Sequence, residues 1–289
     1  MRSRIIVPTF LLLVLTGAVA VPAAAQSWKT VAKSRQLRGQ EALDVSIHYA
    51  VGRFELSQGP DRQLYRINST YDEDAFQLTS SYIESRGRGS LRIDIEGHDE
   101  VDLGNIKDYD FEAGNLSVSL NGSTPLSLSM KFGAAEARLD LGGLRLQELI
   151  LETGASDTHV RFSERNRERA EHCTFKAGAA QFKVDGLGNS RCGRISVSGG
   201  VGTLGLDFSG DWGHDATADI NVGLGTIDIS VPAELGVRIE RSTFLMSFDA
   251  PGFEKQDGGV WLSRNWDTAE HHLTLSVSGA LGSIKITRS

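Results

Sequence analysis

Cysteine is scarce in this sequence, with two residues in 289, and long apolar runs and helical stripes are almost absent. Cys173 and Cys192 are not part of a Cys-x-x-Cys pair, so the usual spacing of redox dithiols and of structural zinc sites is missing. After residue 25 no segment approaches the roughly 20 apolar residues that a membrane-spanning helix needs. No long apolar stripe has the helical period either, which excludes a mainly helical fold; at most we expect one charged helical turn at 165–172.

Positive charge is also in deficit. The formal net charge is −7, and it becomes −9 when the two arginines of the leader described below are removed. A chain with this balance does not attract a phosphate backbone, so nucleic acid is excluded as a partner of the whole molecule.

Residues 1–25 have the pattern of a signal peptide. Two arginines precede an apolar stretch over 5–21, and three alanines form a small-residue cleavage site. Cleavage before Gln26 would leave 264 residues. The alternative is an uncleaved membrane anchor, but Pro8 and the alanine-rich end weaken a spanning helix. We therefore expect an exported protein, periplasmic or extracellular, without a membrane span after cleavage.

Glycine, by contrast, is plentiful, and one stretch raises the question of a nucleotide site. "GVGTLG" at 200–205 matches the Gly-x-Gly-x-x-Gly pattern of dinucleotide-binding turns, which requires a helix to follow. The residues after Thr203 instead alternate with the period of a strand. "GGVGTL" at 199–204 resembles a calcium-binding nonapeptide, but Leu204 replaces its Asp. No cofactor is expected.

These glycines belong to an internal repeat. Five segments align without gaps, from "KFGAAEARLDL" at Lys131 to "NVGLGTIDISV" at Asn221, and their shared glycines are 21 to 24 residues apart. This period is typical of solenoids. We predict that each shared glycine marks a corner where the backbone is left-handed or closely packed. The corner glycines are Gly133, Gly154, Gly178, Gly200 and Gly223.

The residues around each corner glycine alternate as in a strand. In the copy at Gly178, Phe182 and Val184 are predicted to point inward, and Lys183 and Asp185 to face water. A second alternating run precedes each glycine, so each repeat is expected to be two short strands and a corner. Atypical copies beginning at His48 and Ser278 are expected to cap the two ends. The predicted fold is all-β, a β-solenoid-like stack of two-strand coils.

The segments resemble a known group of exported bacterial proteins. "ILETGASDTHVRF", "VSGGVGTLGLDFSGDW" and "NVGLGTIDISVPAELGVRIE" are similar to the C-terminal domain of LiaF-like cell-envelope stress proteins and to the toast-rack family. "HYAVGRFELSQ" is similar to the opening segment of the toast-rack family. The resemblance covers about Val45 to Ile286. It suggests a toast-rack-like β segment over 26–104 and a LiaF-like solenoid domain over 105–289, continuous with each other.

The resemblance implies a β-solenoid-like protein without known catalytic residues, and no catalytic position carries over. Some members restrain a sensor kinase that responds to cell-wall damage, but they carry membrane helices, whereas this chain has only its leader. The expected function is that of a non-catalytic envelope module in stress sensing, adhesion or scaffolding. Its partner would be an envelope protein or a surface polymer, which the sequence does not identify.

The alternative is a carbohydrate-active enzyme on a β-helix. Asp140, Arg161, Asp185 and Asp207 occupy one outward column, and neighbouring rungs lie about 4.8 Å apart, so two carboxylates could act on a glycosidic bond. A solvated ladder of ion pairs explains the same residues. The sequence offers no serine or cysteine nucleophile in a recognisable turn.

Three tryptophans are candidates for a binding surface. Trp212, Trp261 and Trp266 are expected in loops, where they could stack on a sugar or cap the ends of the stack. The seven histidines show no zinc-binding spacing, so no metal site is predicted.

Two arguments about the cysteines disagree. Export favours a disulfide between Cys173 and Cys192. Their offset from the corner glycines differs by three residues, however, which in straight strands separates them by roughly 10 Å along the chain.

Overall fold

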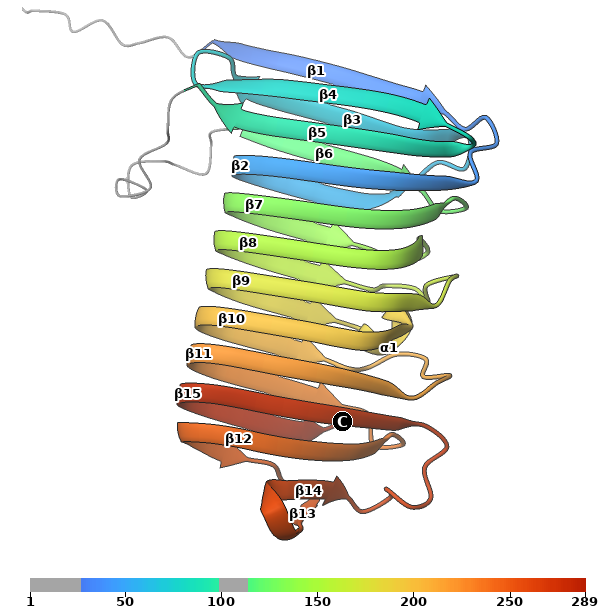
Figure 1. Cartoon of the computed structure of the whole chain (residues 1–289). Coiled ribbons are helices and arrows are strands. Elements are labelled where there is room, and N and C mark those ends of the chain that lie inside the picture. Colours follow the sequence, from blue (N-terminus) through green and yellow to red (C-terminus); the bar gives the residue numbers. More distant parts are fainter. Residues whose placement is uncertain (1–26, 99–113) are drawn as a thin grey trace, which may run out of the picture.

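The computed structural model describes residues 27–98 and 114–289, and the described chain is almost entirely β (Figure 1). The leader predicted over 1–25 and the boundary predicted between 104 and 105 lie outside the described residues. The first six strands are β1 (Trp28–Gln36), β2 (Ala42–Gly59), β3 (Gln63–Asp72), β4 (Phe76–Ser85), β5 (Arg88–Gly97) and β6 (Gly114–Asn121).

The remaining strands build most of the stack. They are β7 (Pro125–Asp140), β8 (Arg145–Arg161), β9 (Ala170–Asp185), β10 (Cys192–Asp207), β11 (Ala216–Val231), β12 (Gly236–Asp249), β13 (Phe253–Lys255), β14 (Val260–Ser263) and β15 (His272–Arg288). The short helix α1 (Leu187–Ser190) and the 3-10 turn η3 (Asp257–Gly259) interrupt them. The helical turn therefore lies at α1 and not at 165–172, where the chain enters β9 through a loop.

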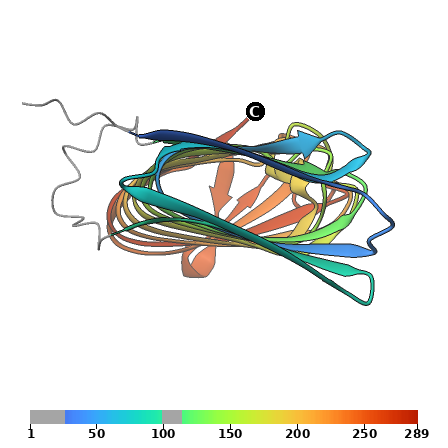
Figure 2. The ribbon, with the colours of Figure 1, turned by 90° about the horizontal axis from the view of Figure 1, so that it is seen from above.

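Each coil of the stack is one long strand that bends in its middle. The leading half of the strand and the trailing half after the bend lie in two facing layers, with the bends along one side of the molecule and the loops along the other (Figures 1 and 2). The repeat predicted two short strands and a corner. The strand is continuous because its parallel register with the next coil is the same before and after the bend, as in Ser198↔Asn221 and Val201↔Leu224.

The inward columns of the repeat form the core between the two layers. Phe182 and Val184 are 2% and 0% exposed, as the alternation predicted, and their equivalents in β7, β8, β10, β11 and β15 are also buried. Stacking places the equivalent apolar residues of neighbouring coils side by side, so each coil covers the apolar edge of the next. The all-β solenoid-like stack is therefore confirmed. None of the helices in the described ranges is long and apolar enough to cross a membrane.

The corner glycines pack closely and are not left-handed. A Cβ atom added to Gly178 or Gly223 would lie 2.9 or 2.7 Å from the carbonyl oxygen of the corner glycine one coil earlier. Positive φ angles occur instead two residues further on, at Gly202 (139°) and Gly225 (141°). Close backbone packing therefore explains glycine at the corner position itself, and a positive φ explains the glycine two residues further on in β10, β11 and β15.

The order of strands in the stack departs from the order in the sequence at the C-terminal end. Strand β15, which carries the atypical copy from Ser278, lies between β11 and β12 and does not cap the stack. Gly282 of β15 stacks on Gly225 of β11, whereas β12 has Met246 at the same position. The copy with glycine takes the inner place because the bends of neighbouring coils approach closely there. Strands β14 and β13 follow β12 and close this end.

The opposite end is capped by strands from the N-terminal part of the chain. The leading half of β2 pairs with β5 and its trailing half pairs with β6, so these two strands together replace one coil. Strands β4, β3 and β1 then add antiparallel to the two layers. On its other side β2 pairs with β7, so the cap and the solenoid belong to one sheet.

Candidate functional site

The outward carboxylates lie in one row on the trailing layer. Asp140 of β7 lies beside Arg161 of β8, which lies beside Asp185 of β9. Asp207 occupies the same position of β10 and lies opposite Ser230 of β11. The structure thus brings together the row that the repeat predicted, on strands spaced about 4.8 Å apart.

Cationic side chains pair with two carboxylates of this row, Asp140 and Asp185. Asp140 accepts a hydrogen bond from Arg161 at 2.5 Å. Asp185 Oδ2 lies 2.6 Å from His159 Nε2 and accepts a hydrogen bond from Lys183 Nζ at 2.9 Å. This is the pattern of a cross-strand ladder of ion pairs.

The same contacts keep two of the carboxylates ionised. Burial raises the pKa of Asp140 and Asp185, but the hydrogen bonds that they accept outweigh it, so each pKa lies below its ordinary value. A general acid that cleaves a glycosidic bond needs a raised pKa in order to hold a proton near neutral pH. Asp207 accepts hydrogen bonds from the backbone N–H of Ser209 at 3.1 Å and from its hydroxyl. Two of the three carboxylates of the row, Asp140 and Asp185, are therefore ionised, which does not fit the protonated acid of a glycosidase.

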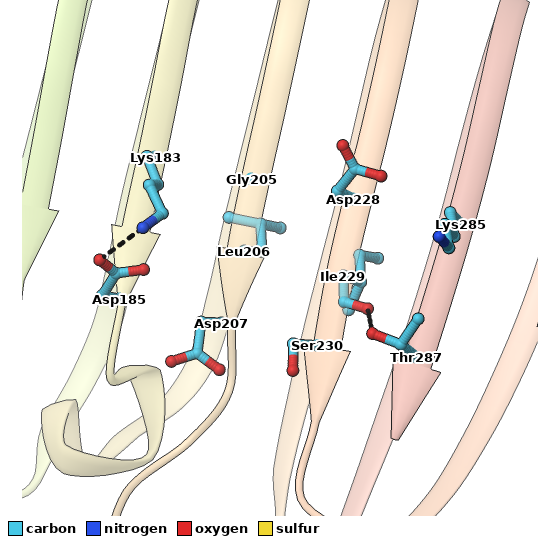
Figure 3. Close-up of a pocket in the computed structure, with 10 residues that line it drawn as sticks. All are labelled: Lys183, Asp185, Gly205, Leu206, Asp207, Asp228, Ile229, Ser230, Lys285 and Thr287. Carbon is cyan, nitrogen blue, oxygen red and sulfur yellow. Dashed lines mark hydrogen bonds and ion pairs between the residues drawn. The ribbon is translucent and has the colours of Figure 1, made fainter. Parts of the chain in front are cut away.

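A groove of about 260 Å³ lies where Gly205 leaves a gap in the trailing face (Figure 3). Lys183 and Asp185 border it on one side, and Asp228 and Lys285 on the other. Because charges of both signs line the groove, it favours neither an anionic nor a cationic ligand.

The three tryptophans are half-buried and pack within the protein. Trp212 stacks on Phe208 with ring centroids 6.3 Å apart and donates its N–H to the Phe208 carbonyl at 2.7 Å. Trp261 lies on β14, not in a loop, and packs on Phe248 of β12 at 5.2 Å. Trp266 contacts His272 edge-on. Trp261, on β14, lies at an end of the stack, whereas Trp212 lies in the loop between β10 and β11 in the middle of it, so capping of the ends does not describe all three residues.

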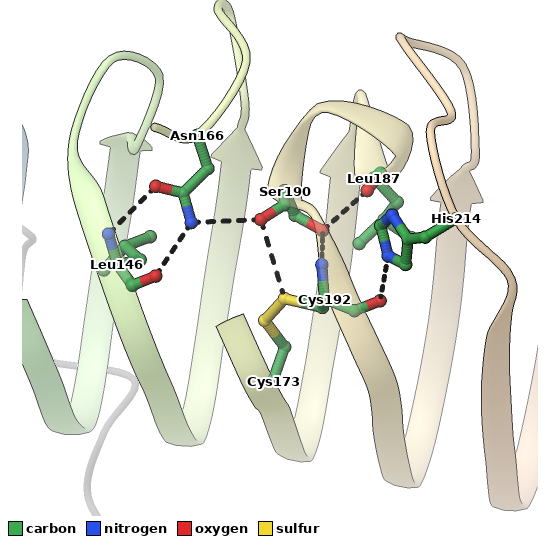
Figure 4. Close-up of a disulfide and its surroundings, with 7 residues drawn as sticks. All are labelled: Leu146, Asn166, Cys173, Leu187, Ser190, Cys192 and His214. Carbon is green, nitrogen blue, oxygen red and sulfur yellow. Dashed lines mark hydrogen bonds between the residues drawn. A yellow bond between two sulfur atoms is a disulfide. The ribbon is translucent and has the colours of Figure 1, made fainter. Parts of the chain in front are cut away.

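Cys173 and Cys192 form a disulfide between β9 and β10, with Cα atoms 6.0 Å apart (Figure 4). The three-residue offset is present, because Cys192 pairs with Ala170 and Cys173 with Ile195. All four residues are buried, although residues three apart in a straight strand face opposite sides. The strands therefore bend here, and the straight-strand estimate of about 10 Å does not hold.

A buried asparagine lies beside the disulfide on the loop side of the stack (Figure 4). Asn166 is 1% exposed, accepts a hydrogen bond from the Leu146 N–H at 2.9 Å and donates to the carbonyls of Leu146 and Ser190. It joins the chain of three successive coils. The repeat did not indicate this residue because it lies between the aligned segments.

The bends of the C-terminal coils carry an exposed apolar stripe. The residue after each corner position is alanine in β7, β8 and β9 but changes to a larger apolar residue in the next four coils of the stack. These four side chains are paired coil to coil and are 43–61% exposed. We call Val201, Leu224, Leu281 and Leu245 the apolar corner stripe.

The two rows that directly flank the apolar corner stripe carry no charged side chains. Three residues before it stand Ser198, Asn221, Ser278 and Ser242, and two residues after it stand Thr203, Thr226, Ser283 and Ser247. The change from alanine to valine and leucine is visible in the sequence once the copies are aligned, but strand alternation predicts only the corners and the strand faces.

Comparison with solved structures gives several proteins of similar length. A candidate cell adhesion protein from Clostridium sporogenes is 17% identical, with 91% of this chain and 100% of that chain covered and a TM-score of 0.47. A candidate adhesin from Bacteroides fragilis is 12% identical over 89% of this chain and 97% of that chain, with a TM-score of 0.36. A candidate lipid-binding protein from Parabacteroides distasonis is also 12% identical, over 89% and 96% of the two chains, with a TM-score of 0.33.

No curated protein matches the chain. The family model described as the N-terminal domain of toast_rack matches residues 23–185. Since this match covers more than half of the sequence, and the sequence resemblance pointed to the same group, the protein belongs to the toast-rack family.

Proposed function

We propose that this protein is an exported, non-catalytic module that presents its stacked strands to another macromolecule of the cell envelope, in adhesion or scaffolding. The observation that carries the proposal is the apolar corner stripe, which is continuous over four coils and borders uncharged rows. Burying a leucine or valine side chain completely contributes about 1.5–3 kcal/mol, so covering four half-exposed ones would favour docking by several kcal/mol.

The proposals of export and of a location in the cell envelope are supported by the sequence. Export is supported by the charged and apolar leader over 1–25. A site in the periplasm or outside the cell follows from export. A role in sensing envelope stress is supported only by the resemblance to LiaF-like proteins, so adhesion or scaffolding is the function we propose. N-terminal sequencing of the exported protein should give Gln26.

The enzyme alternative is weaker because two of the three carboxylates of the row have cationic partners. Arg161 pairs with Asp140 and Lys183 with Asp185, and the pKa of each carboxyl is lowered, while Asp207 accepts hydrogen bonds from Ser209. A retaining or inverting glycosidase needs one carboxyl that stays protonated.

The test of non-catalysis is a variant with Asp185→Asn and Asp207→Asn. The purified variant and the wild type are incubated with cell-wall polysaccharides, the release of reducing ends is measured, and folding is checked by circular dichroism. We expect no release above the protein-free control from either protein and equal binding to isolated envelopes. Release by the wild type that the folded variant loses would replace this proposal by the enzyme reading.

A further inference from the structure

A histidine and two carboxylates gather on the outer face of the leading layer, near the N-terminal cap. His48 lies on β2 directly opposite Asp94 on β5, and Glu96 follows on the same face of β5. One ligand atom from each of the three side chains lies within 4.8 Å of the other two. Imidazole nitrogen and carboxylate oxygen are, besides thiolate sulfur, the usual protein ligands of zinc.

Asp94 has a buried oxygen that lacks a hydrogen-bond donor. The residue is 8% exposed, and its Oδ2 accepts a hydrogen bond from Arg92 Nε at 2.8 Å. Its Oδ1 is buried and accepts no hydrogen bond, although it points to His48 Nδ1 at 3.2 Å. A buried acceptor without a hydrogen-bond donor lowers the stability of the folded protein by about 1–3 kcal/mol relative to one that has a donor. A cation between the two side chains would satisfy it.

The separation of the two atoms suits a bound metal ion. Zinc lies about 2.0–2.1 Å from a histidine nitrogen and about 2.0–2.2 Å from a carboxylate oxygen. With these bond lengths, two ligand atoms 3.2 Å apart subtend an angle of about 100° at the metal, close to the tetrahedral value. Glu96 is exposed and can swing in as the third ligand, which leaves the fourth position to water.

We infer that His48, Asp94 and Glu96 bind one zinc ion that joins β2 to β5. The sequence offered no zinc-binding spacing because the ligands are 46 and 48 residues apart and meet only through the parallel pairing of these strands. Binding requires His48 to be neutral with a free lone pair on Nδ1. The ion would link β5, the strand of the N-terminal cap that pairs with the leading half of β2, to β2, the first complete coil.

A second histidine–carboxylate pair provides a matched control. His159 Nε2 lies 2.6 Å from Asp185 Oδ2 on the trailing layer, again across two parallel strands. There the nearby third group is Lys183, which donates to the same carboxylate oxygen at 2.9 Å. In the first cluster Arg92 donates to Asp94 Oδ2 and leaves Oδ1, the oxygen that faces His48, without a donor, whereas Lys183 donates to the very oxygen of Asp185 that faces His159.

The experiment is an isothermal titration of chelator-treated, dialysed protein with zinc chloride, supported by thermal unfolding with and without zinc. We expect one ion per chain and a raised unfolding temperature in the wild type. His48→Gln should weaken binding at least tenfold and abolish the thermal shift, and Glu96→Gln should weaken binding less. His159→Gln should bind as the wild type does, and circular dichroism should show that every variant is folded.

Two results would overturn the inference. One is the absence of binding at zinc concentrations up to about 1 mM, far above the range of structural sites, which would leave His48 and Asp94 as a direct side-chain contact without a metal. The other is equal binding by the folded His48→Gln variant, which would locate the ion elsewhere. The cobalt-substituted wild type should show the visible absorption bands of a tetrahedral site, and His48→Gln should lose them.

Discussion

At the scale of single residues, the fold depends on glycines at positions that have no room for a side chain and on carboxylates that are held in their charged form. The corner glycines lie against the carbonyl oxygens of the previous coil, and their missing Cβ atoms allow the coils to stack. The sequence predicted which glycines these are, because the repeat aligns them. It did not separate close packing from positive φ, since both select glycine.

Gly200→Ala should destabilise the protein by about 1–3 kcal/mol. Its new Cβ would lie 2.7 Å from the carbonyl oxygen of Gly178, a backbone atom that cannot move without disturbing the next coil. Gly193→Ala on the same strand is the control, because its nearest neighbour would be 3.6 Å away. Urea unfolding of both variants measures the difference, and equal stabilities would show that the corner is not tightly packed.

Asp185→Asn should lower stability at neutral pH and have little effect in acid. Because the pKa of Asp185 is lowered in the folded protein, its contribution is present above the unfolded value, near 4, and is lost as the pH falls through the folded value. The difference in unfolding free energy between wild type and variant should therefore shrink from about pH 5 to about pH 2.

Urea titrations at several pH values test this, with Asp228→Asn as the control on an exposed carboxylate of a nearby coil. A difference that stays constant over the acid range would mean that the hydrogen bonds to Asp185 do not favour its charged form.

At the scale of elements, the disulfide joins β9 to β10 on the side opposite the bends, and the buried asparagine ties the loop between β8 and β9 to the stack. Neither could be derived from strand periodicity. The disulfide depends on a local bend of β9 and β10 that the repeat does not encode, and Asn166 lies in a connection that the repeat leaves undefined. Hydrogen bonds between distant loops become visible only once the coils are stacked.

Reduction of the disulfide between Cys173 and Cys192 should lower the unfolding free energy by about 2–4 kcal/mol, because the bridge closes a loop with a sequence separation of 19. A Cys173→Ala, Cys192→Ala variant should be destabilised similarly. Mass spectrometry after alkylation, with and without reductant, establishes the bond first. Two alkylated cysteines in the unreduced protein would contradict its presence.

Asn166→Ala should be among the most destabilising substitutions of a polar residue, by about 2–4 kcal/mol, because it leaves the Leu146 N–H and the Leu146 and Ser190 carbonyls without partners. Asn68→Ala on the exposed face of β3 is the control and should change stability by less than about 0.5 kcal/mol. Thermal unfolding of the two variants gives the comparison, and a small effect at Asn166 would show that water replaces its hydrogen bonds.

At the scale of the whole molecule, the repeat was enough to predict an all-β stack and which strand faces point inward. Both the two-residue alternation along each strand and the longer period of the coils can be recognised in the sequence. The order of the coils in the stack has no such periodic signal. Strand β15 returns to lie inside β12, and β5 and β6 share the place of one coil. Periodicity identifies the units of a solenoid but not which units become neighbours.

The central claim at this scale is that the protein works by presenting a surface, and the apolar corner stripe is its proposed contact. The direct measurement is the affinity of purified protein for isolated envelopes of the cells that produce it, for wild type and for a Leu224→Ser, Leu281→Ser variant. Ile83→Ser on β4 is the matched control, since Ile83 is exposed but distant in the sheet order from the stripe.

We expect the stripe variant to fold normally by circular dichroism and to bind envelopes at least tenfold more weakly, because two exposed leucines lose their apolar contact. Ile83→Ser should bind as the wild type does. Unchanged binding by the folded stripe variant, or an equal loss in Ile83→Ser, would contradict the account.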